Sequence, residues 1–479
     1  MARDMLQFVS QDKEMPEKRE AEARAADFDE IYGDFNPQAA AEQASRCSQC
    51  GVPFCQVNCP LHNNIPDWLM LTAEDRLEEA YQLSSATNTF PEICGRICPQ
   101  DRLCEGNCVI EKGFESVTIG AVEKYITETA FEEGWVVPVQ PAYEREQSVG
   151  IIGAGPAGLA AADQLRRKGY QVTVYDRYDR VGGLLIYGIP GFKLEKEIVT
   201  RRAELLSESG ITFVLNCEIG TDITFDEIRD KHDAVLIATG VYKARELKMP
   251  GSGLGGVVPA LDYLTASNRK SLGDEVAGFE NGQLNAAGKD VVVIGGGDTA
   301  MDCVRTAIRQ DAKSVTCLYR RDKANMPGSQ REVQNAEEEG VSFQWLSAPA
   351  AVLGDNQATA VRAQRIHLGQ ADETGRQVPQ VISDSDFEVK ADLVIKALGF
   401  DPEDLPKMFA EDGLEVSKWG TVHIDWKTMM TRLPGVFAAG DIVRGASLVV
   451  WGIRDGRDAA DQIDAFIEAE LRGENRIAG

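Results

Sequence analysis

Two segments of this chain share one order of features: a short apolar strand pattern, a glycine-rich turn and a helical pattern. The first begins at Ser148 and reads SVGIIGAGPAGLAAADQLRRKGYQVTVYD. The second begins at Asp290 and reads DVVVIGGGDTAMDCVRTAIRQDAKSVTCLYRR. This order is typical of the βαβ unit of a doubly wound parallel sheet, in which the glycine turn approaches a dinucleotide. Two such units in one chain predict two dinucleotide sites.

The domain organisation follows from length and from a change in pattern. At 479 residues the chain is too long for one hydrophobic core, and Pro138 and Pro141 mark a linker. Before the linker, residues 1–140 are expected to form a helical domain. Its helical patterns cover 17–35, Pro66–Ser84 and Ile119–Glu133. After the linker we predict an α/β fold with two Rossmann-like dinucleotide-binding domains.

The first glycine segment has the spacing G-x-G-x-x-G. Gly153 permits the tight turn, Gly155 lets the backbone approach a diphosphate, and Gly158 lets helix and strand pack closely. The amides at the start of the helix favour phosphate binding. Asp176 ends the second strand, at the usual distance for a carboxylate that binds ribose hydroxyls. A purely structural glycine turn is the alternative interpretation.

Three further elements indicate that the first site binds FAD rather than a nicotinamide cofactor. Gly182-Gly183 follows Asp176 closely, Ala238-Thr239-Gly240 ends a strand, and residues 431–441 resemble the closing strand of flavoproteins with two dinucleotide domains. In that class the Gly-Asp pair meets the ribityl–phosphate part of FAD, although Asp441 is also a suitable helix N-cap. The expected FAD-binding residues are Gly153, Gly155, Pro156, Ala157, Gly158, Asp176, Arg177, Gly183, Leu184, Thr239, Gly240, Gly440 and Asp441.

The second glycine segment has the spacing G-x-G-x-x-A, and its second strand ends in Arg320-Arg321 rather than in an acid. An acid there favours the free 2′-hydroxyl of NAD, whereas two arginines offer charge and bidentate bonds to a 2′-phosphate. We therefore predict NADPH as the cofactor. A solvated arginine pair at a strand end is the alternative. The expected contacts are Gly295, Gly297, Asp298, Thr299, Arg320 and Arg321.

Hydride transfer between a nicotinamide and a flavin needs the two rings in contact, and it needs no obligatory general acid or base. We accordingly predict no catalytic residue in the strict sense. There is also no C-x-x-C near the flavin glycines or in the second nucleotide unit, so a dithiol exit of the thioredoxin reductase type is not supported.

Eight of the eleven cysteines lie between Cys47 and Cys108. They are spaced C-x2-C-x4-C-x3-C and then C-x3-C-x5-C-x3-C, with prolines after Cys59 and Cys98. Zinc is the main alternative, but zinc sites usually pair two C-x2-C arms and only one is present. A flavin that accepts a hydride also needs a one-electron outlet, which zinc cannot provide. We therefore predict two 4Fe-4S clusters.

The formal net charge of -26 argues against binding to nucleic acid or to anionic membranes. The first residues lack a long apolar run, so no signal peptide is expected, and no apolar run approaches membrane-spanning length. We expect a cytoplasmic protein.

The cysteine field and the two nucleotide motifs occur in one order over nearly the whole chain. This order resembles the small (beta) subunit of bacterial NADPH-dependent glutamate synthase, and related modules occur in dihydropyrimidine dehydrogenase. Three long segments add to the resemblance: GGLLIYGIPGFKLEK from Gly182, RRDKANMPGSQREVQNAEEEG from Arg320 and GDIVRGASLVVWGIRDGRDAA from Gly440.

The resemblance implies an NADP domain inserted in the FAD domain. The implied boundaries are 1–140 for the iron–sulfur domain, 146–255 and 405–479 for the FAD domain, and 256–404 for the NADP domain. It also implies interleaved clusters, one held by Cys55, Cys59, Cys104 and Cys108, the other by Cys47, Cys50, Cys98 and a fourth ligand. The residue that matches the fourth ligand of the relatives is Glu123, and Cys94 is the competing candidate.

The family function implied is electron input. In that family a large subunit with FMN, an iron–sulfur centre and a glutaminase domain makes two glutamates from glutamine and 2-oxoglutarate. Two other hypotheses stay open: the same NADPH–FAD–iron–sulfur module serving another partner, such as a ferredoxin or sulfur-compound reductase, and a non-redox interaction protein whose cysteines bind zinc.

Overall fold

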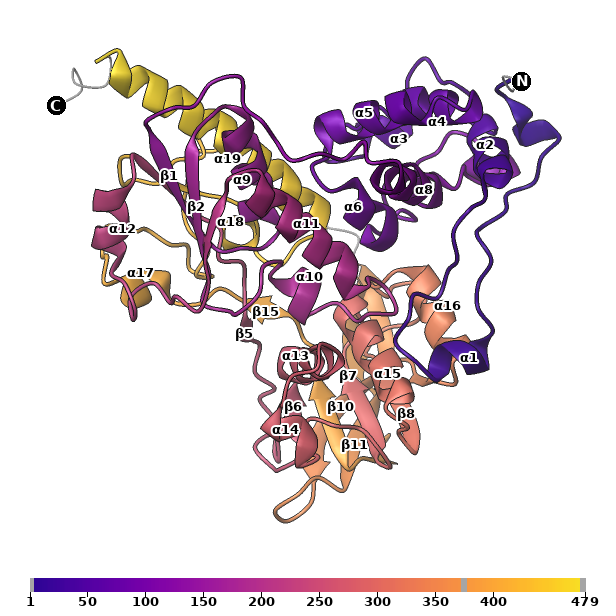
Figure 1. Ribbon diagram of the computed structural model, residues 1–479. Coiled ribbons are helices and arrows are strands. Elements are labelled where there is room, and N and C mark those ends of the chain that lie inside the picture. Colours follow the sequence, from indigo (N-terminus) through magenta and orange to yellow (C-terminus); the bar gives the residue numbers. More distant parts are fainter. Residues whose placement is uncertain (1–3, 372–376, 474–479) are drawn as a thin grey trace.

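The computed structural model describes residues 4–371 and 377–473, and it divides the chain into three parts (Figure 1). A helical N-terminal part lies beside an α/β part that contains the first glycine segment. A second α/β part, which contains the second glycine segment, lies below both in this view. The three parts meet at the centre of the molecule.

The first α/β part is built on a parallel five-stranded sheet with the order β16-β4-β1-β2-β3. Its strands are β1 (Ser148–Ile152), β2 (Gln171–Tyr175), β3 (Thr212–Val214), β4 (Ala234–Ile237) and β16 (Val436–Ala438). Its helices are α9 (Pro156–Arg167), α10 (Leu184–Tyr187), α11 (Lys196–Glu208), α12 (Phe225–Lys231), α17 (Leu405–Phe409), α18 (Asp441–Arg444) and α19 (Val449–Leu471). Strand β16 returns to this sheet from the end of the chain, as an inserted second domain requires.

The second α/β part has its own parallel sheet, with the order β6-β14-β7-β8-β9. These strands are β6 (Val257–Pro259), β7 (Asp290–Ile294), β8 (Ser314–Leu318), β9 (Ser342–Gln344) and β14 (Leu393–Lys396). An antiparallel sheet covers one side, with β10 (Ser347–Leu353), β11 (Ala360–Ala371), β12 (Gln377–Val381) and β13 (Phe387–Lys390). The helices are α13 (Ala260–Ser271), α14 (Ala277–Glu280), α15 (Asp298–Arg309) and α16 (Gln330–Glu338).

The chain crosses between the two α/β parts twice, and the crossings pair with each other. Strand β5 (Lys243–Ala244) leaves the first part and pairs antiparallel with β15 (Phe400–Asp401), which returns to it. The fold class predicted from the two βαβ units is thus confirmed, including the insertion of one nucleotide domain in the other.

The N-terminal part is helical, as predicted. It contains η1 (Gln7–Val9), α1 (Ala21–Ala25), α2 (Pro37–Ser45), α3 (Phe54–Val57), α4 (Ile65–Ala73), α5 (Leu77–Thr87), α6 (Pro91–Ile97), α7 (Glu111–Phe114) and α8 (Ile119–Glu132). The prediction of one helix over Pro66–Ser84 is wrong, because Asp75 adopts a left-handed conformation (φ 60°) and separates α4 from α5. Trp68 on α4 is fully buried and anchors the core of this part.

The prediction of a helix over residues 17–35 is also wrong. Only α1 is helical there, and the remainder forms an extended excursion in which Lys18 bridges Tyr32. We call residues 13–35 the N-terminal strap. It leaves the helical part and reaches the second α/β part, where α1 lies near α15 and α16 (Figure 1). Charged side chains that favour a helix in water are used here to contact another domain.

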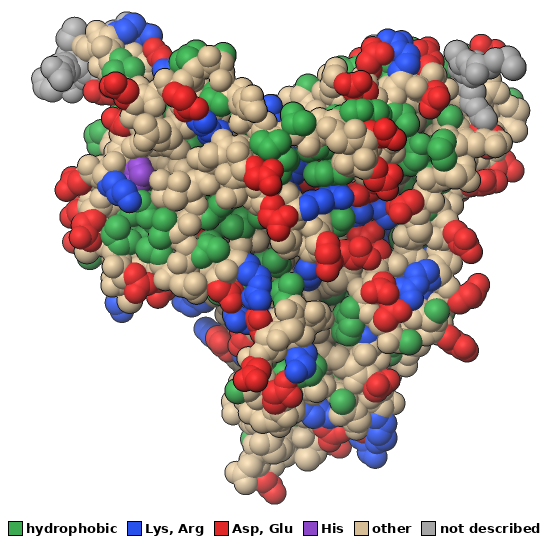
Figure 2. Space-filling model, in the orientation of Figure 1, with side chains coloured by type: hydrophobic (Ala, Val, Ile, Leu, Met, Phe, Trp, Pro, Cys, Tyr) green, Lys and Arg blue, Asp and Glu red, His purple; other side chains and the backbone are tan. Residues whose placement is uncertain are grey.

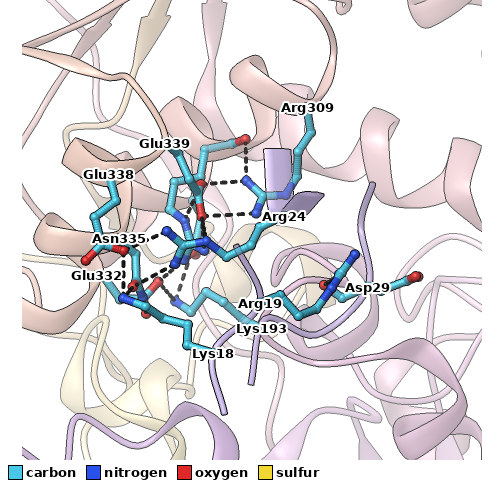
Figure 3. A network of polar contacts seen from close by, with 12 residues as sticks. Lys18, Arg19, Arg24, Asp29, Lys193, Arg309, Glu332, Asn335, Glu338 and Glu339 are labelled. Atoms are coloured by element: carbon cyan, nitrogen blue, oxygen red, sulfur yellow. Dashed lines mark hydrogen bonds and ion pairs between the residues drawn. The ribbon is translucent and has the colours of Figure 1, made fainter. Parts of the chain in front are cut away.

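Arg24 fixes the strap in place (Figure 3). Its side chain is 1% exposed, and its guanidinium lies 2.6 Å from Glu338 Oε2 and 3.7 Å from Glu339 Oε1. Lys18 Nζ lies 2.6 Å from the same Glu338 oxygen. The strap therefore holds the second α/β part against the helical part through buried and half-buried ion pairs.

The long C-terminal helix α19 packs across α9, the helix that follows the first glycine turn. The contact is close because α19 has glycines there: a Cβ on Gly456 would lie 2.1 Å from the carbonyl oxygen of Ala157. We expect Gly456→Ala to force the two helices apart, at a cost of about 1–3 kcal/mol for overpacking. The expected result is a lower melting temperature and less flavin retained after purification.

The matched control is Gly113→Ala, because no atom lies within 4 Å of the added Cβ there. Thermal unfolding and flavin absorbance per chain measure both effects. Equal melting temperature and flavin content in the two variants would contradict this account of the α9–α19 contact.

Candidate functional site

A cavity of about 340 Å³ lies where the three parts meet. Both nucleotide-binding segments contribute to its wall, the first through Gly153, Gly155, Pro156 and Ala157, and the second through Asp298 and Thr299 at the start of α15. Leu184, Thr239 and Gly440–Asp441 line it as well, and the N-terminal part contributes Cys98. The structure thus brings predicted flavin, nicotinamide and cluster residues to one space.

The first glycine turn is held by Asp176, the acid at the end of β2. Its two carboxylate oxygens accept the backbone amides of Ala154 (2.7 Å) and Tyr178 (2.8 Å). Burial raises the pKa of Asp176, and these amide bonds oppose the rise. Gly153 has φ +113°, and a Cβ there would lie 2.3 Å from the carbonyl oxygen of Ala238, so the turn requires glycine.

The remaining predicted flavin residues surround the same turn. A Cβ on Gly183 would lie 2.9 Å from the Cα of Gly155, and one on Gly440 would lie 2.8 Å from Ala157 Cβ. Thr239 Oγ1 is buried and has no hydrogen-bond partner among the described residues. An unpaired buried hydroxyl costs free energy unless a ligand satisfies it. These contacts fit an FAD molecule lying along the turn.

A second, smaller pocket of about 50 Å³ continues from Asp176. Arg177 forms its wall, with its guanidinium over the rings of Tyr178 (5.1 Å) and Tyr242 (5.0 Å). Glu403 pairs with Arg177 at 3.0 Å. A pocket with aromatic and guanidinium walls beside the acid that is predicted to bind ribose suits an adenine ring.

The second glycine turn is formed by Gly295–Gly297, at the start of α15. Gly295 has φ +155°, and a Cβ on Gly296 would lie 2.3 Å from the ring of Tyr319. Arg320 is exposed, whereas Arg321 is buried and its Nε has no hydrogen-bond partner among the described residues. A buried, unpartnered guanidinium nitrogen at this strand end fits the predicted 2′-phosphate.

The cysteines form two neighbouring pockets. The thiols of Cys47, Cys50, Cys55 and Cys108 interact with one another. Burial raises the pKa of Cys47 to about 11 and that of Cys55 to about 12. We call these four the outer cysteine set, because two of them are partly exposed.

The second pocket joins Cys59, Cys98 and Cys104 with Glu123, and Cys94 lies beside it. We call the first four the inner set, since Cys98 lines the central cavity. The eight residues predicted as ligands are thus gathered in two pockets. Cys55 interacts with Cys47, Cys50 and Cys108, whereas the resemblance joined Cys55 and Cys108 with Cys59 and Cys104. Cys104 interacts with both Cys59 and Cys55, so the assignment of thiols to clusters stays a prediction.

The two carboxylate oxygens of Glu123 differ in their hydrogen bonds. Oε1 accepts hydrogen bonds from Asn88 (3.1 Å), Asn63 (3.3 Å) and Ser84 (3.3 Å). Oε2 accepts none within the described part of the chain. Burial raises the pKa of Glu123 to about 7, against the hydrogen bonds from Asn88 and Ser84.

The competing fourth ligand, Cys94, is differently placed. Its thiol donates to Asn88 Oδ1 at 3.7 Å and also interacts with the thiol of Cys98. Over residues 4–371 and 377–473, no three His, Cys, Asp or Glu side chains are close enough to bind one metal ion. A four-iron cluster is larger than an ion and spreads its ligands wider, so its fit depends on which thiols share one pocket.

Sequence reasoning missed a buried charge cluster in the cavity wall. Lys193, on the loop after α10, lies 2.8 Å from Asp302 of α15 and 4.0 Å from Glu332 of α16. Burial lowers the pKa of Lys193, but the two carboxylates raise it overall. Burial raises the pKa of Asp302 to about 6, although Lys193 opposes the rise. In the sequence, the only signal for this charge cluster was the glycine-rich segment around Lys193.

Two family matches agree with these sites. Residues 147–456 match the pyridine nucleotide-disulphide oxidoreductase family. Residues 24–135 match the family described as dihydropyrimidine dehydrogenase domain II, 4Fe-4S cluster. Fold and site together therefore define a two-dinucleotide oxidoreductase that carries an N-terminal iron–sulfur domain.

Curated relatives extend over nearly the whole chain. The glutamate synthase [NADPH] small chain of Azospirillum brasilense is 66% identical and covers 99% of this chain and 98% of its own. The same protein of Escherichia coli K12 is 44% identical, over 98% of this chain and all of its own. The chain belongs to the glutamate synthase small chain family.

Solved structures show the same fold in the two α/β parts. FprA from Mycobacterium tuberculosis in complex with NADPH has a TM-score of 0.58 and 18% identity, over 70% of this chain and 87% of that one. Thioredoxin reductase from T. acidophilum has a TM-score of 0.50 and 21% identity, over 67% and 98%. No helix among the described residues is long and apolar enough to cross a membrane.

The geometry of Glu123 generates a test. We expect Glu123→Ala to lower the iron content per chain and to change the cluster EPR spectrum, because the inner set loses its one free oxygen. Iron assay and EPR of anaerobically purified protein measure this. The matched control is Glu132→Ala, an exposed residue on the same helix. Wild-type iron content and spectra in Glu123→Ala would show that Glu123 is no ligand.

Proposed function

We propose that this protein is the electron-input subunit of a cytoplasmic glutamate synthase. NADPH supplies a hydride, FAD accepts it, and two 4Fe-4S clusters carry the electrons singly to a large FMN-containing subunit, which forms glutamate from glutamine and 2-oxoglutarate. The observation that supports this is the shared cavity: the first glycine turn, the start of α15 after the second glycine turn, and Cys98 of the inner set line one space. The proposed electron path needs the NADPH and FAD sites in contact and an iron–sulfur cluster beside them.

Each cofactor is assigned to its own domain. FAD binding is assigned to residues 146–255 and 405–479, NADPH binding to 256–404, and the clusters to 1–140. Asp176 holds the first glycine turn and keeps the carboxylate beside the ribose position. Arg321, with Arg320 at the rim, supplies the positive charge for the 2′-phosphate. The outer and inner sets each provide four ligands, with Glu123 as the fourth of the inner set.

An exposed apolar patch supports a protein partner at the outer set. Val52, Phe54, Val57 and Val109 are 50–61% exposed, and each lies within two residues of a cysteine of the outer or inner set. Exposed apolar side chains gathered in this way are typical of an interaction surface. On the face drawn in Figure 2, acidic side chains are spread over all three parts with Lys and Arg interspersed. A partner that covers the patch would shield the outer cluster and receive its electrons.

The central test is anaerobic titration with NADPH. We expect the flavin absorbance of the wild-type protein to bleach and cluster EPR signals to follow. In Arg320→Ala/Arg321→Ala the NADPH concentration needed should rise by about tenfold or more, because charge-assisted bonds to the 2′-phosphate are lost. The concentration of NADH needed should change little. An equal loss for both nucleotides would contradict the assignment, and a wild-type spectrum unchanged by NADPH would remove the proposed function.

A second candidate is the same module serving another partner. It is favoured by a relative of a different name: the putative oxidoreductase AegA of Escherichia coli K12 is 46% identical over 94% of this chain, which spans 69% of that protein. Affinity purification of the tagged chain from its own cells separates the two. A large flavin-containing subunit with glutaminase activity is expected, and its replacement by a different redox protein would favour the second candidate.

A further inference from the structure

The loop between Cys98 and Cys104 contacts the second nucleotide site. Arg102 donates to the carbonyl of Pro327 (2.5 Å) and to Asp298 Oδ2 (3.2 Å). Asp101 Oδ2 accepts from Ser329 Oγ and from the Gln330 amide, both at 3.2 Å. A segment of the iron–sulfur domain therefore lies on the start of α15 and the start of α16.

The start of α15 is where a dinucleotide diphosphate is expected, because the glycine turn ends there. Gly297 is the N-cap of α15. The space beside its Cα is open, because no atom lies within 4 Å of a Cβ added there. The amides of Asp298 and Thr299 make no hydrogen bond within the described residues, and both residues line the central cavity. Two free amides at a twelve-residue helix start are thus open to phosphate oxygens.

Asp298 places a negative charge at this position. Its Oδ1 accepts the amide of Ser329 at 2.9 Å, so the carboxylate is fixed beside the free amides. A carboxylate there repels a diphosphate unless a cation balances it. Lys193 interacts with Asp298 across the cavity, and Arg102 is the cation in direct contact with it. Arg102 Nη2 lies 3.2 Å from Asp298 Oδ2, its side chain is 41% exposed, and its Nε makes no hydrogen bond within the described residues.

We propose that Arg102, a residue of the iron–sulfur domain, binds the diphosphate of NADPH. The proposal rests on the proposed function, because it takes the second glycine turn as the NADPH site. Arg102 reaches across the domain boundary, balances Asp298 and presents the rest of its guanidinium to the phosphates that the free amides bind. The nucleotide site is then complete only when the iron–sulfur domain is docked against the NADP domain.

The test compares two ligands that share the 2′-phosphate. NADP⁺ carries the diphosphate and adenosine 2′-monophosphate lacks it. With the flavin- and cluster-loaded protein, we expect Arg102→Gln to weaken NADP⁺ binding by about tenfold, the effect of one lost charge-assisted bond, and to leave binding of adenosine 2′-monophosphate unchanged. Calorimetry or flavin difference spectra measure both. Arg76→Gln is the control, since among the described residues Arg76 pairs only with Glu74 and Glu79, on an exposed surface of the same domain.

The double variant Arg102→Gln/Asp298→Asn separates direct binding from charge balance. We expect NADP⁺ binding to stay weaker than in Asp298→Asn alone. Recovery to the level of Asp298→Asn would mean that Arg102 only neutralises Asp298 and would overturn the proposal. Unchanged NADP⁺ binding in Arg102→Gln, or equal weakening of both ligands, would overturn it as well. Wild-type protein that binds neither ligand would instead count against the proposed function.

Discussion

Hydride transfer takes place only between atoms in contact, and this constraint organises the whole molecule. Two dinucleotides must present their reacting rings to one point, so two separate Rossmann-like units have to converge there. The insertion of one unit in the other achieves this, because the paired crossings β5 and β15 fix both connections at the same hinge. The iron–sulfur domain closes the third side and brings Cys98 to the cavity wall.

Buried ion pairs hold this arrangement. Arg305 and Arg309 of α15 lie 2.8 Å and 2.7 Å from Glu339, with all three side chains fully buried, and Arg24 of the strap joins them (Figure 3). Although burial alone would raise it, the bonds from Arg305 and Arg309 hold the pKa of Glu339 at about 2. Removing one partner of such a group costs about 3–5 kcal/mol, because a buried charge is left uncompensated. The network thus specifies one position for the strap and, through it, for the NADP domain.

The sequence allowed the local part of this structure to be predicted, and the reason is physical. Each glycine turn, the strand before it and the acid or arginine pair after it lie within about thirty residues of one another. Their pattern can therefore be recognised in the sequence alone. The strap was not predictable in this way, because its charged residues read as a helix until Glu338 and Glu339, some three hundred positions away, provide partners. The neighbours of the cysteines were not predictable from spacing either: Cys55 interacts with Cys47, Cys50 and Cys108, whereas Cys59 interacts with Glu123 and Cys94. Lys193 and Asp302 became a pair only through the docking of two domains.

The loop from Cys98 to Cys104 joins two functions in seven residues. Its ends belong to the inner cysteine set, and its middle contacts the proposed NADPH site, with Asp101 bonded to Ser329 and Arg102 to Asp298. Thermodynamic coupling between two sites is reciprocal. A nucleotide that favours one position of Arg102 would favour the matching position of the cysteines, and a cluster that favours that position of the cysteines would favour nucleotide binding by the same coupling free energy. The loop is short and tied at both ends, so it has little freedom to absorb a shift at either end. In the proposed function, occupancy of the NADPH site and the environment of the inner cluster are therefore coupled by covalent connection, without a separate relay.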